Sequence, residues 1–285
     1  MQHDTARDAG TSAGSPINAN KALWEKGDFT RLAATMRESG DELVAWIAPQ
    51  PSMEVLDLGC GDGTTAVPAA RRGAHVLGVD IAANLVAAGN ARAREEGLTE
   101  LQFVEGDASA LTGIEDARFD LVVSIFGAMF APRPNDVATE MVRVCRPGGR
   151  IVMGNWIAGD PTLVAQVLKI SAAFLPPPPE GFISPVSWGQ EDTVLARFGA
   201  AGIPPERIRC ERASYTFRYP GPARDFLSVF RDYYGPTMNA FEAAEKNGKR
   251  RELEEQLEAL FEAQNQGGAD MTVIPATYLR VTVER

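Results

Sequence analysis

Cysteine, histidine and long apolar runs are scarce in this 285-residue sequence, and each scarcity excludes a class of protein. The three cysteines are odd in number and follow no Cys-x-x-Cys spacing. This argues against a disulfide framework or a zinc site and favours a reducing, cytoplasmic compartment. No run reaches the roughly 18 apolar residues that a membrane-spanning helix needs, so we expect no membrane span. The polar stretch 1–19 reads as neither a signal peptide nor an anchor, and residues 1–20 are expected to form a mobile tail.

An excess of basic charge is also missing. The chain has 28 Lys and Arg against 38 Asp and Glu, which gives a net charge of −10. Proteins that bind nucleic acid carry a basic stripe that displaces counterions from phosphate. The densest basic cluster here, in 246–251, lies among glutamates and is typical of the solvated face of a helix. We therefore expect no nucleic-acid partner.

Apolar runs alternate with helical patterns along most of the chain, which is typical of a parallel sheet covered by helices. With 45% hydrophobic residues the chain can bury a large core. We expect a single domain over 21–285, with helical cap insertions at about 157–190 and 221–268. Two alternating segments, 207–219 and 278–283, are predicted to be antiparallel edge strands. The strands before them are expected at 53–58, 75–79, 101–104, 119–126 and 150–155.

The first of these strands leads into a glycine-rich loop, Asp57-Leu58-Gly59-Cys60-Gly61-Asp62-Gly63, before a helix. Glycines let the backbone turn sharply and approach a ligand beside the free N–H groups of a helix start. Any tight strand-to-helix turn can use glycine, so the loop alone is weak evidence. The dinucleotide fingerprint would need glycine at position 64, which is threonine. Because Asp57 and Asp62 would repel a diphosphate, the loop suits an amino acid that carries a sulfonium.

Two more acids follow later strands. Asp80 ends the second strand about 20 residues after Gly59, near the spacing of an acid that binds both ribose hydroxyls. Helix capping is the other common role for an aspartate in this place. Asp107, in Gly106-Asp107-Ala108 after the third strand, would lie at an adenine edge, although Gly-Asp is also ordinary turn chemistry.

Together with Phe119-Asp120-Leu121-Val122 and Arg146-Pro147-Gly148-Gly149, these motifs resemble the class I S-adenosylmethionine-dependent methyltransferases in order and spacing. The resemblance covers about 53–156. More loosely, 24–29 and 126–132 resemble a bacterial branch often labelled ubiquinone/menaquinone-type methylases. The family implies an α/β, Rossmann-like, seven-stranded, mostly parallel sheet with an antiparallel final strand.

The resemblance also implies how S-adenosylmethionine is held, with S-adenosylhomocysteine as the product. The glycine loop would face the methionine part, Asp80 the ribose, and Asp107 with Ala108 the adenine. Trp24 is expected either as a lid over the adenosine or as a staple for the N-terminal helix. The expected cofactor-binding residues are Asp57, Gly59, Cys60, Gly61, Asp80, Ile81, Asp107, Ala108, Ser124, Ile125, Phe126 and Trp24.

The acceptor should lie beyond the carboxyl ends of the strands, where ligands of open α/β sheets bind. The chain offers apolar and aromatic residues there, which favours a hydrophobic or aromatic small molecule. Core packing is the competing role for most of them, above all for the stripe from Phe226 to Tyr234, whose spacing is that of a packed amphipathic helix. The expected acceptor-pocket residues are Met129, Phe130, Asn155, Trp156 and Trp188, with Phe182 and Phe230 as further candidates.

A histidine base is not expected, because His3 is in the tail and His75 begins a strand at the wrong end of the sheet. Ser124 replaces the carboxylate of metal-dependent catechol-type relatives, so we expect no metal. The motif of base amino methylation is also missing from 124–127, which favours C- or O-methylation. Catalysis is expected to rest on positioning and desolvation, assisted by Tyr233, Tyr234 or Arg231, with Asp232 as an alternative.

Two other functions remain open. An aminopropyl transferase of the same fold would need acids in 127–132 to hold a polyamine, and the segment has none. A catalytically silent cofactor-binding scaffold could use the acidic helix at 242–262 as a partner surface. Separately, the sequence leaves the oligomeric state open, and a homodimer is one option. A scaffold has little need for both the glycine loop and Asp80, so we expect an enzyme.

Overall fold

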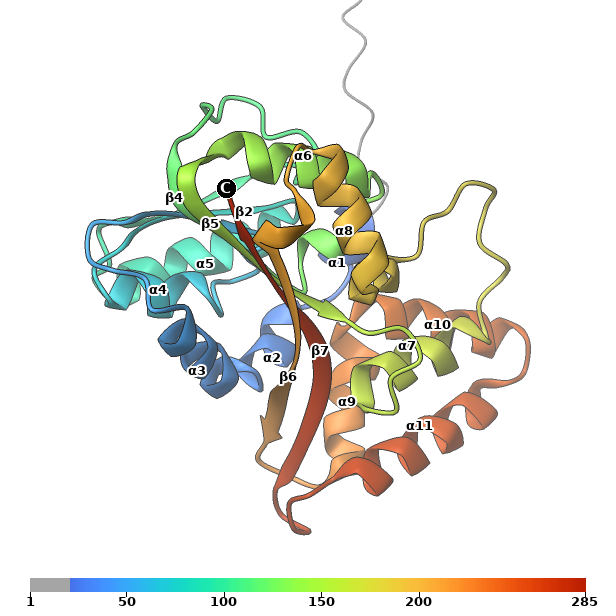
Figure 1. Ribbon diagram of the computed structural model, residues 1–285. Coiled ribbons are helices and arrows are strands. Elements are labelled where there is room, and N and C mark those ends of the chain that lie inside the picture. The colour runs from blue at the N-terminus through green and yellow to red at the C-terminus, as the bar shows by residue number, and fades with distance from the viewer. Residues whose placement is uncertain (1–20) are drawn as a thin grey trace, which may run out of the picture.

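The computed structural model describes residues 21–285, which form one seven-stranded sheet with helices packed around it (Figure 1). The strand order is β3-β2-β1-β4-β5-β7-β6, and β7 alone runs against the other six. This confirms the expected Rossmann-like sheet with its reversed final strand. The strands are β1 (Glu54–Leu58), β2 (His75–Asp80), β3 (Leu101–Glu105), β4 (Phe119–Ile125), β5 (Cys145–Trp156), β6 (Ile208–Tyr219) and β7 (Thr272–Glu284).

The central strands are apolar on both faces because helices cover both sides of a parallel sheet. In β4 every residue from Phe119 to Ser124 is buried. α4 and α5 pack against β2 and β3, and α6 packs against β4 and β5. The helices up to this point are α1 (Lys21–Glu25), α2 (Phe29–Ala34), α3 (Arg37–Ile47), α4 (Ala66–Arg71), α5 (Ala83–Glu95) and α6 (Pro134–Val144).

The segments expected as cap insertions are largely helical. α7 and a short 3-10 turn lie between β5 and α8, and three helices lie between β6 and β7. α7 contacts α10 and α11, so the two segments pack together at one end of the molecule (Figure 1). These elements are α7 (Leu163–Ala172), the 3-10 turn Pro185–Gly189, α8 (Glu191–Ala200), α9 (Ala223–Tyr233), α10 (Gly235–Lys246) and α11 (Arg250–Gln264).

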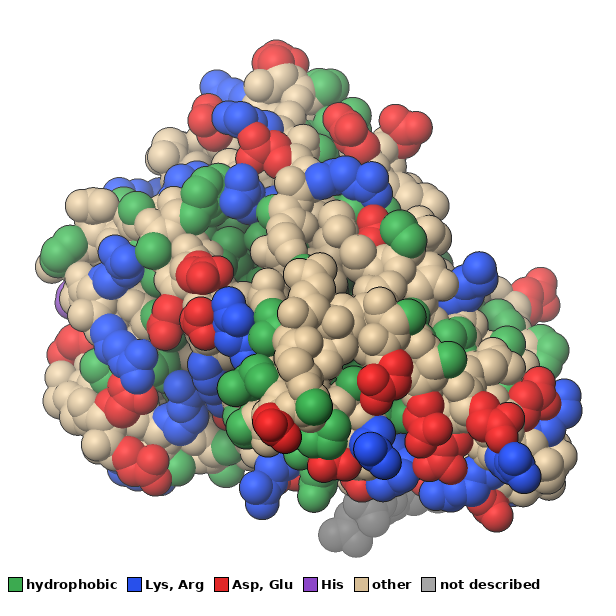
Figure 2. All heavy atoms as spheres, turned by 90° about the horizontal axis from the view of Figure 1, so that it is seen from below, with side chains coloured by type: hydrophobic (Ala, Val, Ile, Leu, Met, Phe, Trp, Pro, Cys, Tyr) green, Lys and Arg blue, Asp and Glu red, His purple; other side chains and the backbone are tan. Residues whose placement is uncertain are grey.

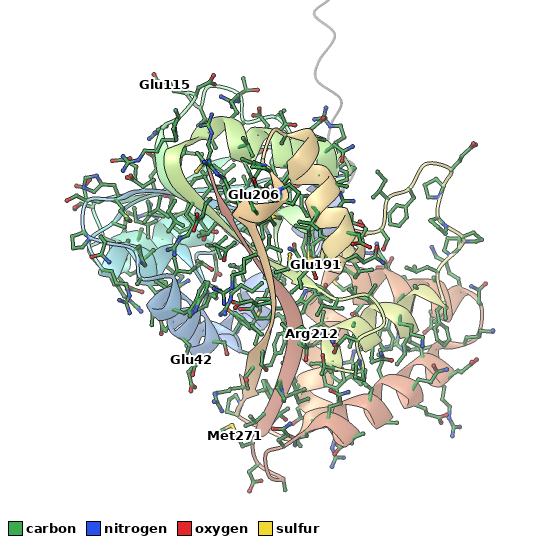
Figure 3. All side chains as sticks on the ribbon, viewed as in Figure 1. Glu42, Glu115, Glu191, Glu206, Arg212 and Met271 are labelled. Atoms are coloured by element: carbon green, nitrogen blue, oxygen red, sulfur yellow. The ribbon has the colours of Figure 1, made fainter. Side chains whose placement is uncertain are left out.

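The β6–β7 hairpin is longer than the sequence pattern predicts. β7 begins at Thr272 rather than at 278. It lies between β5 and β6, so of the two strands in the hairpin only β6 is at an edge of the sheet. β5 pairs with β7 from Tyr278 to Glu284, whereas residues 272–277 pair with β6 alone. The hairpin therefore projects beyond the carboxyl end of β5, and Figure 3 shows Met271 at its far end.

The start of β5 also differs from the sequence pattern. β5 begins at Cys145 rather than at the expected 150, so the motif at 146–149 lies within the strand, where the register against β4 shifts between Phe119 and Leu121. The expected tail, 1–20, lies outside the described residues. Over residues 21–285 no helix has both the length and the apolar character to cross a membrane. On the face drawn in Figure 2, acidic and basic side chains are interspersed.

Candidate functional site

A cavity lies at the carboxyl ends of β1, β2, β4 and β5 and is closed from above by α1, α2, α9 and the projecting part of β6. It holds about 1160 Å³ when its open mouth is counted. Its position matches the crevice where ligands of open α/β sheets bind.

The glycine loop forms the floor of the cavity. The Gly59 N–H donates to the Val79 carbonyl at 2.7 Å, which joins the end of β1 to the end of β2. Gly59 has φ +69°, and a β-carbon there would be 2.6 Å from the Gly127 Cα. Only glycine therefore permits this close approach of two backbones. Cys60 and Gly61 also line the cavity, as expected.

Asp80 lies at the end of β2, on the cavity wall and almost fully buried. Its carboxylate accepts hydrogen bonds from the Gly61 N–H at 2.8 Å and the Ala82 N–H at 2.9 Å. The Asp80 side chain therefore holds both the glycine loop and the backbone that directly precedes α5. Burial raises the Asp80 pKa, while the backbone donors oppose this rise. Each carboxylate oxygen keeps a second lone pair, which a sugar hydroxyl could use.

Asp57 is the buried acid of β1 and also lines the cavity. Within the described residues its Oδ2 has no hydrogen-bond partner. Burial, and then the charge of Asp80, raise the Asp57 pKa to about 7. A buried acceptor without a partner is costly, and a cation placed beside it would remove that cost. The site therefore fits the ammonium group of an amino acid.

The residues after β3 divide into two groups. Gly106 and Ala108 line the cavity together with Ile81, as expected for a flat apolar base. Asp107 is not on the wall: its Oδ1 accepts from the Ser109 N–H at 2.8 Å and the Ser109 hydroxyl at 2.6 Å. This carboxylate therefore holds the turn, and its role toward a base remains a prediction.

The end of β4 is held by Ser124. Its hydroxyl donates to the Leu58 carbonyl at 2.6 Å and accepts from the Ala128 N–H at 2.9 Å, away from the cavity. Ile125 and Phe126 are on the wall. Ser124 therefore positions the neighbouring wall residues by joining β4 to β1.

The upper half of the cavity is aromatic. Trp24 of α1 contacts Phe130 at 4.9 Å, Phe29 at 5.9 Å and Tyr234 at 6.0 Å between ring centroids. Such edge and tilted pairs stabilise the contact beyond the area they bury. The N-terminal segment is therefore part of the wall. The aromatic side chains that line the cavity are Trp24, Phe29, Phe126, Phe130, Trp156, Tyr215, Phe217, Phe230 and Tyr234.

Several expected acceptor residues do not reach this wall. Met129, Asn155 and Trp188 are buried elsewhere in the core. Asn155 faces away because successive residues of a strand point to opposite faces, and its neighbour Trp156 lines the cavity. Trp188 packs on Phe198 and under the Arg197 guanidinium. Phe182 is 55% exposed.

The three expected catalytic residues are also separated. Tyr234 is buried and lines the cavity. Arg231 is instead paired with Asp232 at 2.7 Å and Glu254 at 3.3 Å, beside a separate surface hollow. Tyr233 is half-buried and not on the cavity wall. Along α9 each residue turns the side chain by about 100°, so Phe230 faces the cavity while Arg231 and Tyr233 do not. Tyr234, the first residue after α9, also lines the cavity.

The sequence reasoning missed the contributions of β6, of α2 and of the residue that directly precedes α3. Tyr215 and Phe217, Phe29 and Leu32, and Met36 all line the cavity. The alternation of 207–219 places Tyr215 and Phe217 on one face of a strand, and this was the available signal. The alternating pattern does not indicate that the hairpin projects over the glycine loop.

Comparisons with known proteins agree with this geometry. Residues 56–153 match the family model described as a methyltransferase domain. The chain is 35% identical over 231 residues to an uncharacterized protein of Mycobacterium tuberculosis, covering 80% of this chain and 81% of that protein. It is 38% identical over 118 residues to a ubiquinone/menaquinone biosynthesis C-methyltransferase of Brucella anthropi, covering 39% and 44%. The fold resembles a putative methyltransferase from Bacillus halodurans, with TM-score 0.58, 16% identity and coverage of 87% and 98%.

Proposed function

The chain belongs to the class I S-adenosylmethionine-dependent methyltransferases, and on this premise we propose that it methylates a small, uncharged, hydrophobic or aromatic acceptor. C- or O-methylation is favoured over N-methylation. S-adenosylmethionine, when bound, supplies a methyl group on a positively charged sulfur. The chain's own residues bind this cofactor, place the acceptor and exclude water.

The observation that carries the proposal is the composition of the cavity wall. The charged side chains on it are Asp57, Asp62 and Asp80, and no Lys, Arg or His of residues 21–285 lines it. A carboxylate or phosphate on the acceptor would enter this space without a counter-ion, beside three acids. Burying an unpaired charge is expensive. An uncharged ring meets the apolar wall without such a cost.

The proposed cofactor contacts follow from the same wall. Asp80 accepts hydrogen bonds from the ribose, and Asp57 pairs with the ammonium group. Ile81, Gly106 and Ala108 pack against the base. In each case the side chain or backbone lies on the cavity wall, and the unpartnered Oδ2 of Asp57 supports the ammonium contact.

Catalysis in this proposal rests on holding the acceptor close to the methyl group in a dry site. Trp24, Phe29 and Phe130 close the aromatic half, so Trp24 acts as a lid and joins α1 to the wall at the same time. Tyr234 is the assisting residue, because it alone of the three expected catalytic side chains lines the cavity. Its buried phenol has a raised pKa and stays protonated, so it acts as a hydrogen-bond donor.

The test is a panel of matched acceptors incubated with methyl-labelled S-adenosylmethionine and analysed by mass spectrometry. Each neutral phenol, quinol or indole is paired with its carboxylated analogue. We expect the label on members of the neutral set. Labelling of the carboxylated set alone would overturn the proposed acceptor class. Binding of the cofactor with no labelling in either set would favour the silent scaffold, and transfer of an aminopropyl group from the decarboxylated cofactor would favour that alternative enzyme.

The cytoplasmic location belongs to the same proposal and is supported by the free thiols of Cys60, Cys145 and Cys210. The homodimer stays a prediction.

A further inference from the structure

The Tyr215 hydroxyl is a buried polar group that lacks a hydrogen bond. Tyr215 is 1% exposed and lines the cavity, and its hydroxyl has no partner within residues 21–285. Burial raises the pKa of this phenol, so it stays a donor at neutral pH. Buried tyrosine hydroxyls usually have a partner, and leaving one without costs about 1–3 kcal/mol. Because Tyr215 lines the cavity, a ligand atom bound there could supply the missing acceptor.

The hydroxyl is directed toward the glycine loop by the way β6 crosses the N-terminal helices. The Thr216 N–H donates to the Ser39 hydroxyl at 2.9 Å, and the Arg218 N–H donates to the Thr35 carbonyl at 2.9 Å. These bonds fix the projecting part of β6 against α2 and α3. A β-carbon on Gly40 would be 3.3 Å from the Tyr215 hydroxyl and 2.6 Å from the Thr64 carbonyl. Gly40 therefore leaves room for the phenol to lie next to Thr64, at the end of the loop.

Two guanidiniums lie behind the cavity wall at this corner, next to Thr64 and Asp62. The Arg37 guanidinium donates to the Thr64 hydroxyl and to the Asp62 carboxylate. Arg92 donates to the Asp62 carbonyl at 2.7 Å and lies 4.0 Å from its carboxylate. Two guanidiniums thus surround one carboxylate. Asp57, with its unpartnered oxygen, supplies the negative charge on β1. A cation site and an anion site next to each other match the two charges of an amino acid.

We propose that Tyr215 donates a hydrogen bond to the carboxylate of the cofactor's methionine half, within the positive field of Arg37. The β6 hairpin, which lies outside the matched family segment, is then an element that selects the amino-acid end of the cofactor. Asp57 takes the ammonium group at the same end. The inference rests on the cofactor of the proposed function but not on the acceptor.

The experiment compares three ligands by calorimetry on the purified full chain. S-adenosylhomocysteine carries both charges, its decarboxylated analogue keeps only the ammonium, and 5′-methylthioadenosine lacks the whole amino-acid end. For Tyr215→Phe we expect S-adenosylhomocysteine to bind about tenfold more weakly, because a hydrogen bond to a charged group is lost. The other two ligands should bind as to the wild type, within about twofold.

Tyr219→Phe is the matched control, since Tyr219 is on the same face of the same strand but stacks on Phe226 away from the cavity. It should change none of the three affinities. An equal loss for all three ligands with Tyr215→Phe would show a structural role and overturn the proposal, as would an unchanged affinity for S-adenosylhomocysteine. If the wild type binds none of the ligands, the cofactor assignment itself fails, which is a separate result.

A second experiment substitutes Arg37 and does not depend on the Tyr215 hydroxyl. Arg37→Gln should weaken S-adenosylhomocysteine several-fold while 5′-methylthioadenosine keeps its affinity, and Arg37→Lys should restore most of the loss because it keeps the charge. An equal effect of Gln and Lys would contradict the role of the positive field.

Discussion

The Phe126 ring lies parallel to the Trp156 indole, with 3.7 Å between centroids and 8° between planes. Phe126 has a φ of +59°, a left-handed conformation that is uncommon for any residue but glycine. Tyr215 and Tyr278 contact the same ring by their edges, at 5.1 and 5.2 Å. Three aromatic partners thus hold a strained residue at the end of β4, where two halves of the cavity wall meet.

This strain predicts an unusual order of stability. Phe126→Ala should destabilise the fold by about 3–5 kcal/mol, as for other large-to-small core changes. Phe126→Gly should destabilise it by about 1 kcal/mol less, since glycine adopts a positive φ without steric cost. Urea unfolding of both variants measures the difference. At an ordinary backbone position the alanine variant would be the more stable, and that result would contradict the strain.

Asp80→Asn should weaken the binding of S-adenosylhomocysteine by at least tenfold while the fold survives. The amide cannot accept from the Gly61 and Ala82 N–H groups and also from both ribose hydroxyls, so hydrogen bonds to a charged acceptor are lost. Asparagine is a milder change than alanine, which would leave both backbone donors without a partner. Glu105→Gln is the control, since Glu105 pairs with Asp80 in register on β3 but has an exposed side chain. Calorimetry that finds equal affinities for both variants would refute the ribose contact.

The affinity for S-adenosylhomocysteine should rise with pH between about 6 and 8. The Asp57 pKa in the free protein is about 7, so the carboxyl is roughly half protonated there. An ammonium group favours the carboxylate, so binding releases a proton, and below the pKa the affinity falls by up to about tenfold per pH unit. Calorimetry in two buffers of different ionisation enthalpy counts the protons released.

Asp57→Asn isolates this effect, because Asp80 and the rest of the wall are unchanged. The variant should bind more weakly at pH 8 and show little change toward pH 6. The same raised pKa makes the free wild-type protein less stable as pH rises from about 4 through 7, since the unfolded chain keeps an ordinary aspartate pKa. Wild-type and variant affinities that follow parallel pH curves would exclude Asp57 as the titrating group.

Tyr234→Phe should lower kcat about tenfold or more and leave the affinity for S-adenosylhomocysteine unchanged, once an accepted acceptor is known. The change removes only the hydroxyl, whose buried position on the wall lets it orient the acceptor. Tyr233→Phe, at the last residue of α9, is the matched control and should keep wild-type kinetics. Equal kinetics for Tyr234→Phe and the wild type would leave Tyr234 as a packing residue beside Phe230.

The sequence alone determined the glycine loop, the place of Asp80 and the succession of the parallel strands along the chain. These features depend on local constraints. Gly59 must have a positive φ, Asp80 ends an apolar run, and short buried strands alternate with helical patterns at fixed spacing. The class of cofactor follows from the family resemblance that these motifs carry. The structure then places the loop and the acid at the adjacent ends of β1 and β2.

Only the tertiary structure decided which of the remaining side chains reach the cavity. Tyr215 and Phe217 line it because the β6–β7 hairpin projects past β5. The hairpin hydrogen-bonds to α3 and to the residue that follows α2, which are far from it in the chain. Arg231 and Trp188 carry suitable chemistry but pack elsewhere. The direction in which a helix or hairpin turns its side chains depends on long-range packing, and no local pattern records it.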